Sequence, residues 1–386
     1  MSVVFSERCL GPEYAWARKW LFEAAFPLWL EKGWDRQTGG FHDALSMNGA
    51  RAAVPNRLRV QTRQIYAFSL AGKLGWGGDW LEAVLKGLHF LRLFKRDDGL
   101  YMSSLTKSSC EFDLYDQAFV LLALASAYEQ LGFDRKLASA AMGIVRNLRR
   151  EYANHHGGFE ESIPPSLPLR SNPHMHLFEA ALAWVAVGVD ECFRALAIDI
   201  LLLAESRFVV GGSIAENFDQ DWRVSAETDA PREPGHQFEW AFLLSEADRL
   251  VGSFTTGLQQ RLYSFGTRGI NPSRNVVHFS MDSEGGVVNA RARLWAQTER
   301  LRASLRFKRN ASRSSDVRTA FACVRSFLTV PTPGLWYEWQ AADGSFEVSD
   351  VPATTLYHIV NGFSEFFDQR AVGEAGGVGL QAPSPQ

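Results

Sequence analysis

The chain has 386 residues, of which 46% are hydrophobic and 22% are charged, with 32 glycines and 15 prolines. This is the composition of an ordinary globular protein, and it excludes a disordered, collagen-like or low-complexity chain. The formal net charge of −3 provides no excess of positive charge for a nucleic acid or an anionic membrane, so neither is expected as a partner.

Cysteine spacing and apolar runs indicate where the protein resides. Four cysteines stand far apart, at positions 9, 110, 192 and 323, without the short spacings of zinc sites or disulfide-rich domains. The N-terminal segment has no long apolar stretch, so a secretory signal peptide is not expected. The longest apolar runs, 118–127 and 180–189, have about half the length needed to cross a bilayer. We therefore expect a soluble cytoplasmic protein.

Apolar residues recur at helical spacing along most of the chain. About twelve helices are expected, paired as hairpins, and the fold class is all-α. In chain order the expected helices are 13–32, 62–75, 79–95, 114–132, 135–152, 174–189, 191–207, 234–251, 254–268, 289–309, 314–328 and 353–369.

Glycine- and aromatic-rich loops separate the hairpins, at 33–45, 95–105, 155–162, 211–222, 278–289 and 333–346. They recur about every 50 to 60 residues, and an internal repeat of that length predicts a solenoid or a closed helical ring. No linker interrupts the pattern before the C-terminal tail. We expect one domain over residues 1–373 and a disordered tail over 374–386.

Three histidines are expected near helix starts. His176 and Glu179 lie three residues apart just after an Asn-Pro pair that begins a helix, and His236 and Glu239 repeat this arrangement. His358 lies near the start of the last helix. The positive end of a helix dipole disfavours the imidazolium, whereas a nearby carboxylate favours it and fixes the tautomer. These opposing influences are typical of a general acid or base.

Other interpretations compete with acid–base catalysis. A single histidine of this kind is more often a core residue, and His/Glu clusters also bind zinc or iron. The spacing is not that of a zinc protease helix, however, and it reverses the Glu-x-x-His of di-iron bundles, so we expect neither a metal nor a cofactor. Acidic pairs such as Asp113/Asp116 and Glu160/Glu161 would suit a glycosidase, although turns use the same residues. Phosphate-binding loops and nucleophile elbows are missing from the sequence.

The aromatic residues favour a sugar ligand. Many of the 12 tryptophans stand next to charged residues, and a sugar stacks its C–H faces on rings while its hydroxyls bind polar groups. A non-catalytic barrel that binds a sugar or a protein is the alternative from a different class. A pure binder would not need the paired His/Glu arrangement with Arg63.

Seven short blocks connect these motifs: QTRQ at 61–64, LYDQAF at 114–119, NPHMHLFEA at 172–180, IAE at 214–216 with DW at 221–222, GHQFEW at 235–240, WAQTE at 295–299 and YH at 357–358. In order and spacing they resemble the N-acylglucosamine 2-epimerase family of sugar isomerases and epimerases. One small departure is Ala296, where members of that family often have proline.

The resemblance implies an (α/α)6 barrel of six inner and six outer helices, in agreement with the helix count from periodicity. The active site would lie at the mouth where the long loops gather. The implied chemistry is metal-free and passes through a cis-enediol. A histidine opens the pyranose ring and a base removes the proton at C2. The proton then returns to C1 in isomerisation, or to the opposite face of C2 in epimerisation.

The resemblance also implies roles for individual residues. His236 and His358 resemble the acid/base pair, with His358 taking the C2 proton and His236 opening the ring or redelivering a proton. Glu239 would orient His236, and Arg63 would stabilise the enediolate charge. His176 resembles a substrate-binding histidine with a helper role. Further expected pocket residues are Tyr115, Asp116, Trp295, Glu299 and Trp336.

Within the family, the run LRVQTRQIY at 58–66 looks most like the D-mannose isomerase branch. We therefore expect a monosaccharide substrate and the interconversion of D-mannose and D-fructose. Sulfoquinovose isomerase, cellobiose 2-epimerase and N-acylglucosamine 2-epimerase are competing branches, because the same histidines serve isomerisation and 2-epimerisation. The resemblance also allows a homodimer.

Overall fold

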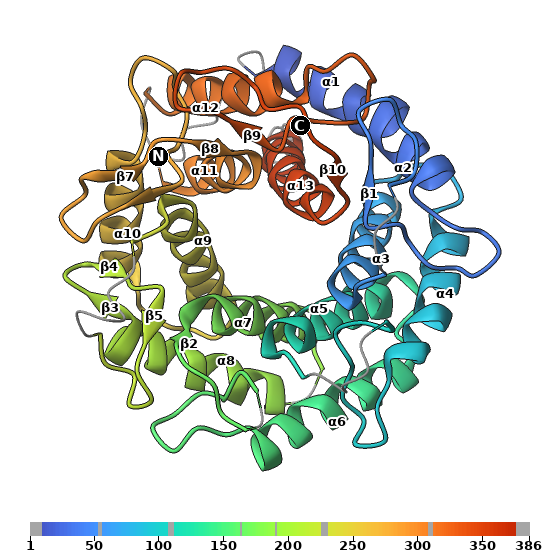
Figure 1. The fold of residues 1–386 in the computed structure, drawn as a ribbon, viewed down its shortest axis with the longest axis vertical. Coiled ribbons are helices and arrows are strands. Elements are labelled where there is room, and N and C mark those ends of the chain that lie inside the picture. Colours follow the sequence, from blue (N-terminus) through green and yellow to red (C-terminus); the bar gives the residue numbers. More distant parts are fainter. Residues whose placement is uncertain are drawn as a thin grey trace, which may run out of the picture.

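The computed structural model describes residues 10–52, 56–106, 112–162, 164–189, 191–224, 231–307 and 312–375. Over these residues the helices form two concentric rings (Figure 1). The prediction of an all-α (α/α)6 barrel is confirmed. The division into a domain over 1–373 and a tail over 374–386 stays a prediction, because residues 376–386 lie outside the described part of the chain.

Six helices form the inner ring: α3 (Leu58–Lys73), α5 (Leu114–Gln130), α7 (Ser171–Ala186), α9 (Pro234–Leu250), α11 (Leu294–Phe307) and α13 (Thr355–Ala375). The outer ring contains α4 (Trp80–Leu91), α6 (Arg135–Glu151), α8 (Glu191–Leu203), α10 (Thr256–Arg268) and α12 (Ser312–Leu328). Its first member consists of α1 (Gly11–Lys19) and α2 (Phe26–Lys32), joined by a π-helical turn over Trp20–Ala25.

Sequence pattern decides which ring a helix joins. In α5 the apolar residues surround the helix, and Leu114, Phe119, Leu121 and Leu124 are all buried. In α6 the buried residues form one stripe, Ala138 to Leu148, while lysine and arginine occupy the rest of the surface. A helix that is apolar all round packs between neighbours, whereas a one-sided helix covers a surface.

Long loops and short connections lie at opposite ends of the barrel. Each long loop runs from the end of an outer helix to the start of the next inner helix. Short strand pairs order these loops: β1 (Ala44–Leu45) with β10 (Val351–Pro352), β2 (Leu169–Arg170) with β5 (Asn217–Phe218), β3 (Val209–Val210) with β4 (Ser213–Ile214), β6 (Ser280–Met281) with β7 (Val287–Asn289), and β8 (Ala292–Arg293) with β9 (Trp339–Gln340). The β1–β10 pair joins the first and last loops, and α13 packs against α3, so the ring is closed.

The observed helices follow the expected ones, and the largest shifts of a start are in α3, which begins at Leu58 rather than residue 62, and in α11. The helix expected over 289–309 begins at Leu294, because β7 and β8 occupy the residues before it. Among the described residues, none of the helices has both the length and the apolar character needed to cross a lipid bilayer.

Candidate active site

In five of the inner helices, the side chain of the fourth residue forms hydrogen bonds with a long loop. The fourth residue of α3, α5, α9 and α11 is a glutamine whose amide accepts the N–H of one loop residue and donates to the carbonyl of the same residue. In α7 the fourth residue is a histidine that accepts one loop N–H at 3.0 Å. These residues are Gln61, Gln117, His174, Gln237 and Gln297.

His174 therefore has a structural role. Its Nε2 accepts the N–H of Phe159, and its Nδ1 donates to the carbonyl of Arg170 at 3.1 Å. Burial lowers the pKa of His174 to about 4, so the ring is neutral in this arrangement.

The residue two positions later in the same helices faces the barrel axis. It is Arg63 in α3, His176 in α7 and Glu239 in α9, and all three line the same cavity at the loop end of the barrel. In α11 it is Glu299, which lies beside that cavity and binds His358. The repeated register thus places loop anchors and polar axial residues in the first turns of the inner helices.

The cavity has a volume of about 150 Å³. It brings together seven of the ten predicted site residues: Arg63, Tyr115, His176, His236, Glu239, Trp295 and His358. It also includes residues that the sequence did not indicate, namely Asn172, Glu233, Phe279, Arg293 and Thr355.

Two predicted pocket residues lie elsewhere. Asp116 is buried beneath Tyr115 and forms a 3.0 Å ion pair with Arg59. Trp336 is a core residue, with its ring stacked on Trp29 at a centroid distance of 5.1 Å. The structure does not bring either side chain to the cavity.

His236 is oriented by a carboxylate other than the expected one. Its Nδ1 lies 2.9 Å from Oε2 of Glu216, which comes from the loop after β4, whereas Glu239 turns toward the axis and toward His176 at 3.9 Å. The second oxygen of Glu216 accepts the N–H of Glu233 at 3.2 Å. Burial opposes protonation of His236, but the charges of Glu216 and Glu233 outweigh it and raise the pKa of His236 to about 10. His236 is therefore an imidazolium at neutral pH.

His358 has the opposite charge state. Its Nδ1 lies 2.8 Å from Oε1 of Glu299 on the neighbouring inner helix. Burial, together with the positive charge of Arg63, holds the pKa of His358 well below its usual range. A neutral ring that donates from Nδ1 to Glu299 leaves a lone pair on Nε2, which is the requirement for a general base.

The third histidine belongs to a buried network. His176 Nδ1 lies 3.3 Å from Oε2 of Glu179, as the i,i+3 spacing predicts, and Tyr357 donates its hydroxyl to the same oxygen. Burial lowers the pKa of His176 to about 4. The carboxylate of Glu239 has no hydrogen-bond partner among the described residues, and burial with the nearby charge of Glu299 raises its pKa well above the usual range.

Arg63 is a buried cation that is not neutralised by a carboxylate. Over the described residues, its hydrogen bonds go to the hydroxyl of Tyr115 and to the carbonyl of Thr354, and its Nε has no partner. The guanidinium lies 4.1 Å from the ring centre of Phe119. Such a group can stabilise negative charge that develops on a ligand in the cavity.

Trp295 contacts both catalytic candidates. Its ring centre lies 4.9 Å from that of His236 and 5.6 Å from that of His358. The indole therefore provides an apolar surface between an acid and a base, and a sugar ring can stack on such a surface.

Three sets of side chains have ligand atoms within 4.8 Å of one another and could hold a metal ion: His176 with Glu179 and Glu239, His236 with Glu216 and Glu233, and His358 with Glu239 and Glu299. In each set, however, the Nδ1 of the histidine is bonded to a carboxylate oxygen of the same set. These bonds occupy Nδ1 of each histidine and one carboxylate oxygen, and they do not involve Nε2 or the other carboxylate oxygens of each set. Metal-free chemistry stays a prediction for a chelator experiment.

One small cavity is thus lined by the imidazolium of His236, the neutral imidazole of His358 and the guanidinium of Arg63, which has no carboxylate partner over the described residues. The model of the N-acylglucosamine 2-epimerase (GlcNAc 2-epimerase) family matches residues 18–362. The chain belongs to this family. It is therefore an enzyme of the sugar isomerase and epimerase class.

Relatives and solved structures support this assignment. The chain is 40% identical over 369 residues to a protein of Rhizobium meliloti (strain 1021) named mannose-6-phosphate isomerase, covering 90% of this chain and 95% of the relative. It shares its fold with cellobiose 2-epimerase from Spirochaeta thermophila DSM 6192 (TM-score 0.85, 19% identity, 96% of this chain and 99% of that one). A D-mannose isomerase structure is similar to the same extent (TM-score 0.83, 18% identity, 96% and 99%).

Glu216 is the main site residue that sequence reasoning missed. It lies within one of the family blocks, but no helical spacing connects it to His236, which follows 20 residues later. Only the loop that carries β4 and β5 brings the two side chains together.

Proposed function

We propose that the protein is an aldose–ketose isomerase that interconverts D-mannose and D-fructose through a cis-enediol. The observation that carries the proposal is the position of two histidines on the same cavity, each bonded through Nδ1 to a glutamate, His236 at 2.9 Å and His358 at 2.8 Å, with pKa shifts in opposite directions. His236 is a proton donor and His358 a proton acceptor. Isomerisation of an aldose needs both functions, one at the ring oxygen and one at C2.

Each step has a residue suited to it. His236 donates a proton to the ring oxygen as the pyranose opens, and the neutral imidazole that results takes up the proton that the O1 hydroxyl releases. His358 Nε2 then takes the proton from C2, and Arg63 stabilises the negative charge that develops on the enediolate oxygens. A proton passes from O2 to O1, and the protonated His358 returns its proton to C1, which gives the ketose. The proposed pair matches the roles that the family resemblance implies.

An unphosphorylated substrate is favoured by the charges of the cavity. Arg293 is already paired with Glu338 at 2.6 Å, and the carboxyl groups of Glu233 and Glu239 also line the cavity. A phosphate dianion would have to compete with Glu338 for Arg293. The relative named mannose-6-phosphate isomerase makes mannose 6-phosphate the matched comparison substrate.

A 2-epimerase is the second candidate, since the fold is shared with a cellobiose 2-epimerase. The same acid and base would serve it if the proton returned to the opposite face of C2. Product identity separates the two functions, because a ketose indicates isomerisation and a C2-epimeric aldose indicates epimerisation.

The test is NMR of D-mannose incubated in heavy water with chelator-treated protein. We expect fructose to form, with deuterium at the carbon that receives the proton. Faster formation of glucose would favour epimerisation, and turnover of mannose 6-phosphate alone would favour the phosphorylated substrate. Sugar binding without any hydrogen exchange would indicate a non-catalytic barrel.

A further inference from the structure

A second and larger cavity lies at the other end of the barrel. Its volume is about 440 Å³, compared with about 150 Å³ for the catalytic cavity, and the two share no lining residue. The catalytic cavity is lined from the first turns of the inner helices, whereas Lys73, Glu129 and Asp368 line this one from the last turns of α3 and α5 and the second half of α13. We refer to it as the lower cavity.

A layer of buried charges separates the two cavities. Glu179 lines the lower cavity, yet its carboxylate binds His176 and Tyr357 on the side of the catalytic cavity. Arg302 also lines the lower cavity and lies 3.5 Å from Glu179 and 3.4 Å from Glu299. The lower cavity is therefore a separate site on the far side of the catalytic network.

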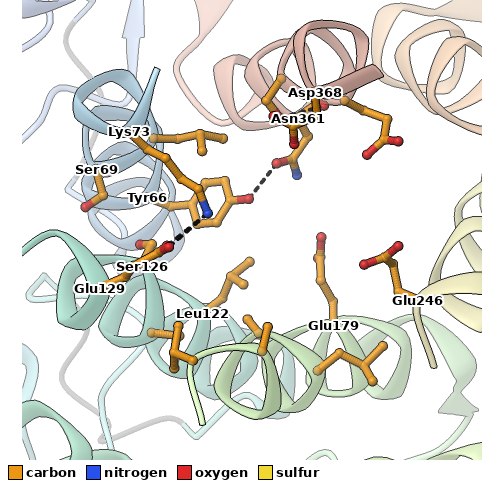
Figure 2. Close-up of a pocket in the computed structure, with 18 of the residues that line it drawn as sticks. Tyr66, Ser69, Lys73, Leu122, Ser126, Glu129, Glu179, Glu246, Asn361 and Asp368 are labelled. Carbon is orange, nitrogen blue, oxygen red and sulfur yellow. Dashed lines mark hydrogen bonds and ion pairs between the residues drawn. The ribbon is translucent and has the colours of Figure 1, made fainter. Parts of the chain in front are cut away.

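Two buried polar side chains that line the lower cavity have atoms without a partner among the described residues. Ser69 is fully buried and its hydroxyl makes no hydrogen bond, but this hydroxyl lies on the side of α3 away from the middle of the cavity (Figure 2). Asn361 is 2% exposed, and its Nδ2 makes no hydrogen bond. Its amide oxygen accepts the hydroxyl of Tyr66 at 2.6 Å, and Figure 2 shows this bond, so the amide nitrogen is the atom left over. Buried polar atoms are rarely left in this state, so a ligand with a hydrogen-bond acceptor would satisfy the amide of Asn361.

Most charged groups of the walls are already paired, and burial with the nearby charge of Glu365 raises the pKa of Asp368, which favours its neutral form. Figure 2 shows Lys73 bound to Glu129 beside the cavity. The other ion pairs join Arg249 to Glu246 at 2.6 Å, Arg306 to Glu246 at 2.8 Å and Arg306 to Glu365 at 2.8 Å. An ionic ligand would have to break these pairs, whereas an uncharged ligand with hydroxyl groups would hydrogen-bond to their outer atoms.

The remaining wall is apolar. Leu122, Leu182 and Phe242 line the lower cavity between the polar groups. Alternating apolar and hydrogen-bonding surfaces match a molecule that carries C–H faces and hydroxyls together. The volume is also in the range of small-molecule sites, about 300 to 1,000 Å³.

We propose that the lower cavity binds a small uncharged polyhydroxylated molecule, a sugar or a polyol, through Asn361. This site is distinct from the catalytic cavity, and binding there does not require the proposed isomerase activity. The ligand would contact Glu179, the same carboxylate that holds His176 and Tyr357.

The experiment uses D-mannitol, which has six hydroxyls and no carbonyl and so cannot be isomerised. Its dissociation constant is measured by ligand-observed NMR titration of the full chain, and its position by a crystal soaked with the polyol. We expect mannitol in the lower cavity and, for Asn361→Leu, binding that is about fivefold to tenfold weaker, as loss of one hydrogen bond predicts.

Ser126→Ala is the matched control. Ser126 also lines the lower cavity, but its hydroxyl already donates to the carbonyl of Ala123 at 3.0 Å. This variant should bind mannitol as the unmodified protein does, and so should Arg63→Met, which alters only the catalytic cavity. Ser69→Ala removes a hydroxyl that faces away from the cavity, so it should also bind mannitol as the unmodified protein does.

Three outcomes would overturn the proposal: equal effects of Asn361→Leu and Ser126→Ala, mannitol found only in the catalytic cavity, or a lower cavity that holds water alone at saturating mannitol. Because the readout is binding, a protein that failed to isomerise mannose would still give a clear result.

Discussion

The carboxylate of Glu216 binds Nδ1 of His236 at 2.9 Å. Glu216 lies on a loop and His236 on an inner helix. The charges of Glu216 and Glu233 raise the pKa of His236 to about 10. Nδ1 of His358 lies at a similar distance from a carboxylate oxygen of Glu299. His358 is nevertheless neutral, because burial and the charge of Arg63 lower its pKa. Two similar His–Glu pairs thus give one acid and one base.

The pH dependence of kcat/KM follows from these charge states. His236 acts as an acid only while protonated, so activity should fall as the pH rises through about 10. His358 acts as a base only while neutral, and its lowered pKa keeps it neutral to well below pH 6.5. We expect a broad bell-shaped profile, measured as initial rates of fructose formation from mannose. A profile that falls on the alkaline side near pH 7 would contradict the assignment of His236.

Replacing the partner of His236 should move the alkaline limb. Glu216→Gln removes the negative charge that favours the imidazolium, so the pKa of His236 should fall and the limb should move to lower pH. Above the lowered pKa, the rate should fall about tenfold for each further increase of one in pH. The pH profile of kcat/KM is the measurement. Glu239→Gln is the control: because Glu239 does not bind His236, it should move the alkaline limb much less. An unmoved limb in Glu216→Gln would show that another group sets it.

The two catalytic histidines should be distinguishable from a structural one. His236→Ala and His358→Ala are each expected to lower kcat by about 100- to 10,000-fold, the usual contribution of a general acid or base. Circular dichroism should show an intact barrel. His174→Gln is the matched control: it places in α7 the residue that holds the same position in α3, α5, α9 and α11, and it should keep nearly full activity. Near-normal turnover by either alanine variant would rule out its role.

The sequence predicted the helices and the axial residues because both depend on local spacing. The apolar periodicity of α5 and α6 is a property of consecutive residues, and His176 with Glu179 is an i,i+3 pair. Glu216 was missed as the partner of His236 because their pairing depends on a loop path. Glu239, three residues after His236, was the local guess, and the structure replaces it.

Aromatic residues were harder to place from the sequence. Trp295 and Trp336 each have a charged residue two positions away in the sequence, yet Trp295 lines the cavity and Trp336 stacks on Trp29 in the core. Asp116 was similarly ambiguous, since a buried ion pair with Arg59 and a pocket position produce the same sequence pattern. Burial of these side chains depends on packing between distant helices, which composition and spacing do not encode.

Loss of the loop anchor on α7 should reduce stability rather than chemistry. His174→Ala leaves the buried N–H of Phe159 without an acceptor, which costs about 1 to 3 kcal/mol of the free energy of unfolding. His174→Gln should recover most of that loss. Urea unfolding followed by tryptophan fluorescence measures both variants, and equal stabilities of the two would show that the anchor contributes little.

Replacing Arg63 should reduce activity without reducing stability. It is a buried cation whose hydrogen-bond partners over the described residues are a hydroxyl and a carbonyl, and an uncompensated buried charge is unfavourable for folding. Arg63→Met keeps much of the volume and removes the charge, so the free energy of unfolding should stay the same or rise. Because the charge that stabilises the enediolate is lost, kcat should fall by about 100- to 1,000-fold, as for the loss of an oxyanion donor.

The measurements are urea unfolding and initial rates with mannose. Arg59→Met is the control: it breaks the ion pair with Asp116 and should lower stability. A destabilised Arg63→Met with normal kcat would show that Arg63 supports the fold rather than the reaction.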